Sequence, residues 1–172
     1  MEQVRSRLAA TAPRLAALTA DLAPSQLLAS PDLDAWSAYD VLAHLRACAD
    51  VWSNRIAAIL AEDQPALRAV NPRSWMKQTD YLDLEFRRSL RTFAWQRADL
   101  SSDPRPLTPK DWVRAATVTG AGKVREWTML FYGQRLARHE RQHGQQAARI
   151  VATVRGRLPL ADGLARPPQV PA

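Results

Sequence analysis

Apolar positions recur at steps of three and four residues along four long segments of the chain. Residues 2–22, 37–62, 75–100 and 123–155 show this spacing, which places their apolar side chains on one face of a helix. Pro13 lies inside the first segment and predicts a kink or a late start of the regular helix. The pattern favours an all-α protein built as a four-helix bundle.

Short polar motifs mark where two helices begin. Ser37 and Asp40 have the spacing of a capping box, which predicts a helix that starts at residue 37. Thr108 followed by Pro109 predicts a short helix or turn that carries Trp112. Each motif satisfies or removes backbone N–H groups that the first helical turn leaves without a partner.

The composition changes near the C-terminus. Residues 157–172 hold four Pro and scattered apolar residues without a helical period. The 172 residues, 47% of them hydrophobic, suffice for one domain with a core. We therefore expect one domain at residues 1–156, followed by a Pro-rich C-terminal tail at residues 157–172.

The chain carries a formal net charge of +7, and nearly all of its basic residues are Arg. The arginines are spread along every segment and form no continuous basic tract. This distribution favours solvated helix faces, and we do not expect nucleic acid to be the partner.

The location of the protein is expected to be cytoplasmic. Cys48 is the one cysteine, so no internal disulfide forms, which fits a reducing compartment. No apolar run approaches the roughly 20 residues that cross a bilayer, and no signal-peptide pattern opens the sequence.

The three histidines all lie on inward-facing apolar seams. His139 and His143 are four residues apart, so both imidazoles lie on one helix face, where they can share a metal ion. His44 lies on the wide apolar face of the second long segment. One such histidine would be read as a packed, hydrogen-bonded side chain, but the coincidence of three favours a metal site. Imidazole ligands suit Zn, Ni, Cu or Fe.

Residues 139–143 also spell H-E-x-x-H, the zincin protease motif, in which Glu140 would be the general base. We do not favour this alternative, because no Glu follows Glu140 as a third ligand and no strand pattern is available to bind a peptide. Glu140 points about 100° away from His139 around the helix axis. A surface or interface role is therefore expected for Glu140.

Other side chains near the histidines are candidates with simpler alternatives. Cys48, one turn beyond His44, is a fourth ligand, a redox-sensitive thiol or, the favoured reading, a small core residue. Asp40 is either an acceptor that orients His44 or only a cap. Tyr132 and Arg135 are weak candidates for contacts with anionic substrate groups. The simpler alternatives are half-buried packing for Tyr132 and a solvated surface charge for Arg135. Core or interface anchors are expected at Trp36, Trp52, Trp112 and Trp127.

Two stretches carry a family resemblance. Residues 36–45 (WSAYDVLAHL) resemble the first signature of the DinB-like (YfiT-like) metalloenzyme superfamily, and residues 139–146 (HERQHGQQ) resemble its second, H-E-x-x-H-x-x-Q. Residues 55–65 and the pair Asp111-Trp112 are also similar to that family, and the resemblance spans residues 2–155. Two departures are Gly144, beside a ligand position, and Pro13.

The resemblance implies a four-helix bundle of up-down-down-up topology. It also implies a divalent ion, Zn or Ni, held at His44, His139 and His143, and pairing as a homodimer. Characterised members of the family are enzymes that depend on a low-molecular-weight thiol, as S-transferases or isomerases.

Three functions follow as hypotheses. The leading one is a metal-dependent small-molecule enzyme, most specifically a thiol-dependent S-transferase or isomerase. The alternative is a non-catalytic metal-binding protein of the stress response. A nucleic-acid binder, suggested by the charge, and a hydrolase of the H-E-x-x-H type rank below these two.

Overall fold

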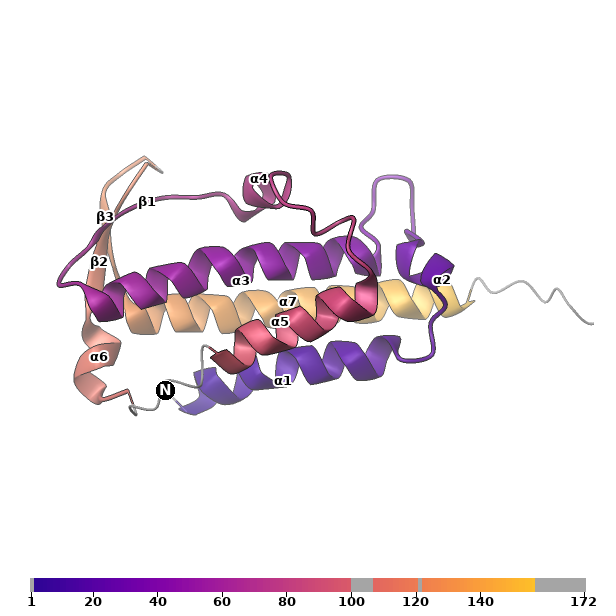
Figure 1. Ribbon diagram of the computed structural model, residues 1–172, viewed down its shortest axis with the longest axis horizontal. Coiled ribbons are helices and arrows are strands. Elements are labelled where there is room, and N and C mark those ends of the chain that lie inside the picture. Colours follow the sequence, from indigo (N-terminus) through magenta and orange to yellow (C-terminus); the bar gives the residue numbers. More distant parts are fainter. Residues whose placement is uncertain (1, 100–106, 121, 157–172) are drawn as a thin grey trace, which may run out of the picture.

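Four long helices packed side by side make up most of the computed structural model (Figure 1). It describes residues 2–99, 107–120 and 122–156, so the predicted tail at residues 157–172 lies outside the described part. The long helices are α1 (Glu2–Thr19), α3 (Ala38–Ala61), α5 (Phe86–Asp99) and α7 (Met129–Gly156). The predicted four-helix framework is therefore present.

Short elements complete the fold, and they include strands. A three-stranded sheet lies at one end of the bundle (Figure 1), with β2 parallel to β1 and antiparallel to β3. The all-α expectation is therefore wrong in detail, since the protein is mostly helical with a small sheet. The short elements are α2 (Pro24–Leu28), β1 (Ala66–Arg68), α4 (Pro72–Met76), α6 (Pro109–Val113), β2 (Ala115–Thr119) and β3 (Arg125–Thr128).

The last helix begins later than its apolar pattern predicts. Residues 123–128 precede α7 and contain β3, because Gly120 and Gly122, both with φ of +83°, lie in the connection between β2 and β3. Thr128 accepts a hydrogen bond from the backbone N–H of Phe131 (3.1 Å), which satisfies a free donor in the first turn of α7.

The third predicted helix is two separate elements. The chain leaves helical structure after α4, and α5 begins only at Phe86. Leu82, which the pattern placed on an inner face, is 43% exposed, whereas Phe86, Leu90 and Phe93 are buried as predicted. The first helix continues through Pro13, so a late start of that helix is also wrong.

The second long helix begins where its motif predicts. Ser37 is the cap of α3: its hydroxyl oxygen accepts from the N–H of Asp40 (3.2 Å), and its own N–H donates to the Asp40 carboxylate (2.8 Å). The Thr108 cap of α6 is confirmed in the same way, and Trp112 is buried. No helix in the described part of the chain is long and apolar enough to span a membrane.

Helices α3 and α7 pack against each other through apolar side chains. Leu42 and Leu45 of α3 share one core cluster with Ile150 and Val151 of α7. A second cluster joins Cys48 and Trp52 to Leu136, Ala137 and residues of α1. This packing places the buried face of α3 opposite the histidine pair of α7.

Candidate metal centre

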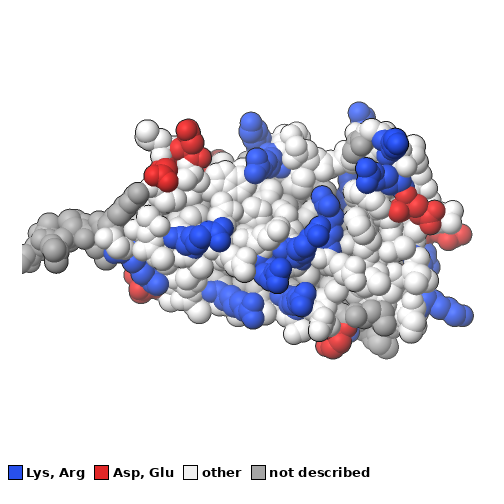
Figure 2. All heavy atoms as spheres, turned by 180° about the vertical axis from the view of Figure 1, so that it is seen from behind, with Lys and Arg blue, Asp and Glu red and all other residues white. Residues whose placement is uncertain are grey.

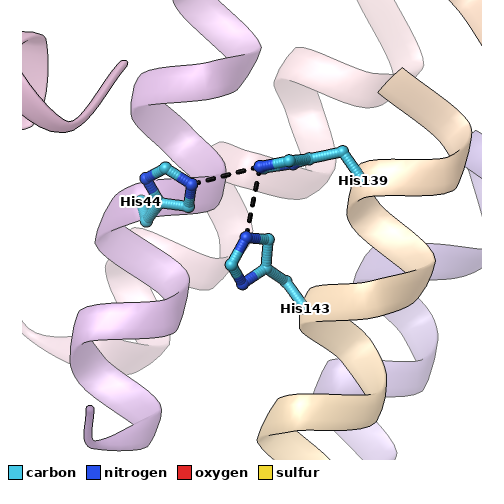
Figure 3. A group of neighbouring side chains, drawn as sticks. All are labelled: His44, His139 and His143. Carbon is cyan, nitrogen blue, oxygen red and sulfur yellow. Dashed lines mark hydrogen bonds between the residues drawn. The ribbon is translucent and has the colours of Figure 1, made fainter. Parts of the chain in front are cut away.

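The three histidines meet between α3 and α7 (Figure 3). Nε2 of His139 lies 3.2 Å from Nε2 of His44 and 3.2 Å from Nε2 of His143. Each of the three residues offers a nitrogen atom, and these atoms lie within 4.8 Å of one another. A site assembled from residues 95 positions apart is thus closed by the packing of two helices.

The geometry fits a single ion. Two nitrogens bound about 2.0–2.1 Å from one tetrahedral ion lie about 3.3 Å apart. The two printed Nε2 separations are within about 0.1 Å of that value. Without an ion, two neutral imidazoles come this close only if the N–H of one donates to the lone pair of the other. Three nitrogen lone pairs that converge on one point suit a cation. The described residues therefore fit a divalent ion held by three imidazoles.

The electrostatic environment keeps the imidazoles neutral. Burial, helped by the neighbouring His143, lowers the pKa of His44 to about 4. Burial, followed by the charges of His143 and His44, lowers the pKa of His139 to about 3. Burial also lowers the pKa of His143, whereas its hydrogen bond to Gln146 raises that pKa. At neutral pH all three therefore hold lone pairs that metal binding requires.

Gln146 orients His143 from one turn away. Its side-chain Oε1 lies 2.8 Å from Nδ1 of His143, a distance at which Nδ1–H donates and Nε2 keeps its lone pair for the ion. Nδ1 of His44 and Nδ1 of His139 have no hydrogen-bond partner among the described residues. Sequence reasoning missed this role of Gln146, although the H-x-x-Q spacing of the second signature was the signal for it.

Indole rings enclose the cluster. The ring of Trp36 stacks on His143 at 5.7 Å with an interplanar angle of 15°, and its edge meets His44 at 5.1 Å. Trp52 meets His139 at 5.0 Å in an edge contact. The sequence predicted both indoles as core or interface anchors. It did not predict that they fix the imidazole rings and limit access of water to the site.

Arg73 of α4 brings a positive charge to the rim of the site. Its guanidinium carbon lies 5.1 Å from the centroid of Trp36, and the side chain is exposed. Helix α4 is tied to α3 because Trp75 donates to Asp50 (3.4 Å) and Tyr81, further along, donates to the same carboxylate (2.5 Å). No sequence signal linked Arg73 to the histidines, since the contact depends on how α4 folds back over α3.

Carboxylates stay out of the cluster. The group of potential ligand atoms that lie within 4.8 Å of one another consists of the three histidines and includes no carboxylate of the described residues. Asp40 uses its carboxylate on the Ser37 cap, where it accepts from the backbone N–H at 2.8 Å and from the hydroxyl at 2.6 Å. The structure thus gives Asp40 the capping role of the two that the sequence left open.

Cys48 lies beside the cluster within the core. Its Sγ is 3.5 Å from Nε2 of His44 and 3.9 Å from Nε2 of His139, and the residue is fully buried. Burial raises the pKa of the thiol to about 12. Its apolar neighbours in the packed cluster include Trp52 and Leu136. Cys48 therefore occupies the place of a small core residue.

Glu140 is not at the surface, which corrects the sequence expectation. It is 1% exposed, and its Oε1 lies 2.7 Å from Nε of Arg97, which is 2% exposed. Burial raises the pKa of Glu140 and lowers that of Arg97, and the charge of each partner opposes the shift of the other. The direction about 100° from His139 points into the bundle, because α1 and α3 pack on either side of α7 and Arg97 reaches Glu140 from α5.

Tyr132 and Arg135 have separate environments. Tyr132 is 1% exposed rather than half-buried, and its hydroxyl accepts from Arg55 at 3.1 Å. Arg135 is exposed, with its guanidinium 5.8 Å from the Trp127 ring centroid. Its positive charge contributes to the lowered pKa of His139. Of the two weak candidates, only Arg135 is accessible to a substrate.

Comparisons with known proteins identify a family and a similar fold. The family model described as the DinB superfamily matches residues 7–147. A solved structure reported as "YfiT from Bacillus subtilis is a probable metal-dependent hydrolase with an unusual four-helix bundle topology" superposes with a TM-score of 0.73. Sequence identity to that protein is 18%, over 88% of this chain and 85% of the other, so the match shows a shared fold. No curated protein matches the chain.

Proposed function

The chain belongs to the DinB superfamily, and on that premise we propose that it is a metal-dependent enzyme acting on small molecules. His44, His139 and His143 hold a divalent ion, zinc or nickel. The observation that carries the proposal is the convergence of three neutral Nε2 atoms, two of whose separations are 3.2 Å. The up-down-down-up order of helices, pairing as a homodimer and a cytoplasmic location are part of this proposal.

The chemistry of the site follows from its charges. When bound, a divalent ion held by three neutral imidazoles keeps its full charge and is a strong Lewis acid toward a thiol or a water. Arg73 adds a positive charge at the rim, and no carboxylate balances the cluster within the described residues. Trp36 and Trp52 exclude water from two sides of the ring cluster. The site therefore selects an anionic ligand.

We infer that this ligand is the thiolate of a low-molecular-weight thiol, used in an S-transferase or isomerase reaction. The sulfur would form a bond to an electrophilic carbon while the bond from that carbon to its leaving group breaks. The leaving group would depart with the bonding electron pair, and the proton of the thiol would pass to solvent. This chemistry needs no carboxylate base at the site. Arg73 and Arg135 are positioned to bind carboxylate groups of the thiol or its acceptor.

Hydrolysis is a second candidate, because the similar solved structure is titled a probable metal-dependent hydrolase. In this chain Glu140 does not supply the general base of the H-E-x-x-H mechanism, since its carboxylate is buried against Arg97. A hydrolase would therefore have to activate water without a carboxylate from that motif. A non-catalytic metal-binding protein is the remaining alternative.

A panel of thiols tests the proposal. Metal-loaded protein should turn over a model electrophile only when a small thiol is present, and His143→Ala should abolish both metal binding and turnover. Turnover of ester or amide substrates without thiol assigns the hydrolase. Bound metal with neither activity assigns the non-catalytic protein. Thiol-dependent turnover that persists after the metal is removed contradicts the proposal.

A further inference from the structure

Helices α7 and α1, which pack against each other, both carry a net positive charge, and α5 carries +3. Helix α7 carries five Arg against one Glu, which is Glu140 paired with Arg97, so its net charge is +4. Helix α1 carries three Arg against Glu2, so its net charge is +2. The chain as a whole has +7. On the side of the molecule turned away from the viewer in Figure 1, Lys and Arg side chains cross the middle of the surface, and Asp and Glu lie nearer its ends (Figure 2).

A groove between α1 and α7 gathers four of these arginines. It has a volume of about 400 Å³, and its lining includes Arg7, Arg135, Arg138 and Arg141, with no acidic residue. No ion pair joins any of these four guanidinium groups to a described residue. Four unbalanced cations in one hollow repel each other, and an anionic ligand removes that repulsion.

The groove continues along the same helix pair. An adjoining hollow of about 380 Å³ shares Arg141 and adds Arg14, Gln145 and Glu140, whose carboxylate is buried against Arg97. Together the two hollows follow α7 from Phe131 to Ala148, which is about 25 Å at 1.5 Å per residue. A linear polyanion fits this shape better than a compact one.

Aromatic side chains lie at one end of the groove. Phe131 lines it and is 38% exposed, and its ring lies 4.9 Å from that of Trp127, over which the guanidinium of Arg135 is placed. Exposed rings beside arginines provide stacking surfaces for nucleobases, while the guanidinium groups bind phosphates in bidentate fashion. A polyphosphate has no base that could stack on these rings.

We propose that the α1–α7 groove binds single-stranded nucleic acid. The two hollows of about 400 and 380 Å³ supply the space for one strand along the helix pair. The arginines bind the phosphates, and Phe131 stacks on a base. The argument from sequence against a nucleic-acid partner relied on arginines scattered along the chain, and the fold brings those of α1 and α7 to one groove. The groove shares Arg135 with the surroundings of the three-histidine cluster, but binding of a strand along it does not depend on the chemistry of the metal site.

Fluorescence anisotropy of a labelled short oligothymidylate with the full-length protein tests the proposal. We expect saturable binding at low salt that weakens about 50-fold between 0.05 and 0.2 M salt, as four phosphate contacts imply. Arg138→Gln combined with Arg141→Gln should weaken binding at least about tenfold and halve the salt dependence. The matched control is Arg88→Gln combined with Arg91→Gln, two exposed arginines of α5, which should change binding less than about twofold.

Phe131→Ala separates nucleic acid from other phosphate chains. It should weaken oligothymidylate binding at least about fivefold and leave binding of inorganic polyphosphate unchanged. Unchanged melting temperature and metal content verify that the variants are folded. No saturable binding at 0.05 M salt overturns the proposal, as does an equal loss in the groove and control variants. If Phe131→Ala affects neither ligand, the assignment to nucleic acid is wrong.

Discussion

His139 and Glu140 are neighbours on α7, yet they belong to two polar regions that are built in opposite ways. The imidazole cluster contains three neutral bases, of which His44 is buried and His139 and His143 are partly accessible. The Arg97–Glu140 pair is almost completely buried, and its charges compensate each other at 2.7 Å. The first region retains unused binding capacity, which chemistry requires. In the second region the two charges are paired with each other, and this pairing stabilises the fold.

The comparison separates the halves of the H-E-x-x-H motif. Its two histidines face α3, whereas its glutamate faces α5, because successive helix residues point about 100° apart. In a protease this motif supplies both the metal ligands and the base. In this chain its histidines belong to the imidazole cluster, and its glutamate belongs to the ion pair with Arg97. The following predictions test this division, beginning with the largest effect.

Loss of one imidazole should abolish the metal site. His139→Ala removes the nitrogen that is 3.2 Å from both other ligand atoms, so the remaining two no longer form a three-ligand site. Metal content by elemental analysis should fall from about one ion per chain to none detectable. The metal-dependent increase in melting temperature should vanish with it. Full metal retention in His139→Ala would contradict the site.

Loss of one partner of the Arg97–Glu140 ion pair should destabilise the fold rather than remove the metal site. Glu140→Ala leaves the Arg97 guanidinium buried without its partner carboxylate, and unfolding in urea should become easier by about 3–5 kcal/mol. Replacing both partners, Arg97→Met with Glu140→Leu, should restore most of that stability. Folded protein from the double variant should bind metal with the affinity of the original chain. A loss of metal in this variant would make Glu140 part of the site.

Loss of the group that orients a ligand should have an intermediate effect. Gln146→Leu removes the acceptor 2.8 Å from Nδ1 of His143, which should weaken metal binding by about 10–100-fold. Competition with a chelator measures this change. Gln142→Leu, at an exposed position of the same helix, is the control and should leave the affinity unchanged. Equal effects of the two variants would remove the orienting role of Gln146.

The pH dependence of the metal-free protein tests whether its imidazoles are neutral in the fold. Unfolded histidines take up protons near pH 6.5, whereas the folded pKa values are about 4 for His44 and about 3 for His139. The unfolded state therefore binds more protons below pH 6.5, so the stability these groups contribute is present above that pH and declines from about 6.5 toward 4. Melting temperatures should follow this trend, and they should fall less steeply in His44→Gln. An identical slope in both proteins would show that His44 is not neutral in the fold.

The sequence was sufficient to predict the helical framework and the three histidines that meet between α3 and α7. The capping box at Ser37 and the spacing of His139 and His143 are local features, determined by residues within one turn. The convergence of His44 with them followed from apolar seams that have to face each other in a bundle.

The misses share a physical cause, which is dependence on partners far away in the chain. The partner of Glu140 is Arg97, 43 positions earlier, and no local pattern connects them. The strands are three to five residues long, and β1 pairs with β2 across about 50 residues, so their own apolar pattern carried little signal. Arg73 reaches the rim only through the fold of α4 over α3.

X-ray absorption at the edge of the metal in protein purified without added metal tests the central claim most directly. The account predicts about one divalent ion per chain, bound by three imidazole nitrogens at about 2.0–2.1 Å together with an exchangeable ligand that an added small thiol replaces with sulfur. An ion with carboxylate ligands or fewer than three imidazoles would contradict it, as would protein that binds no divalent metal.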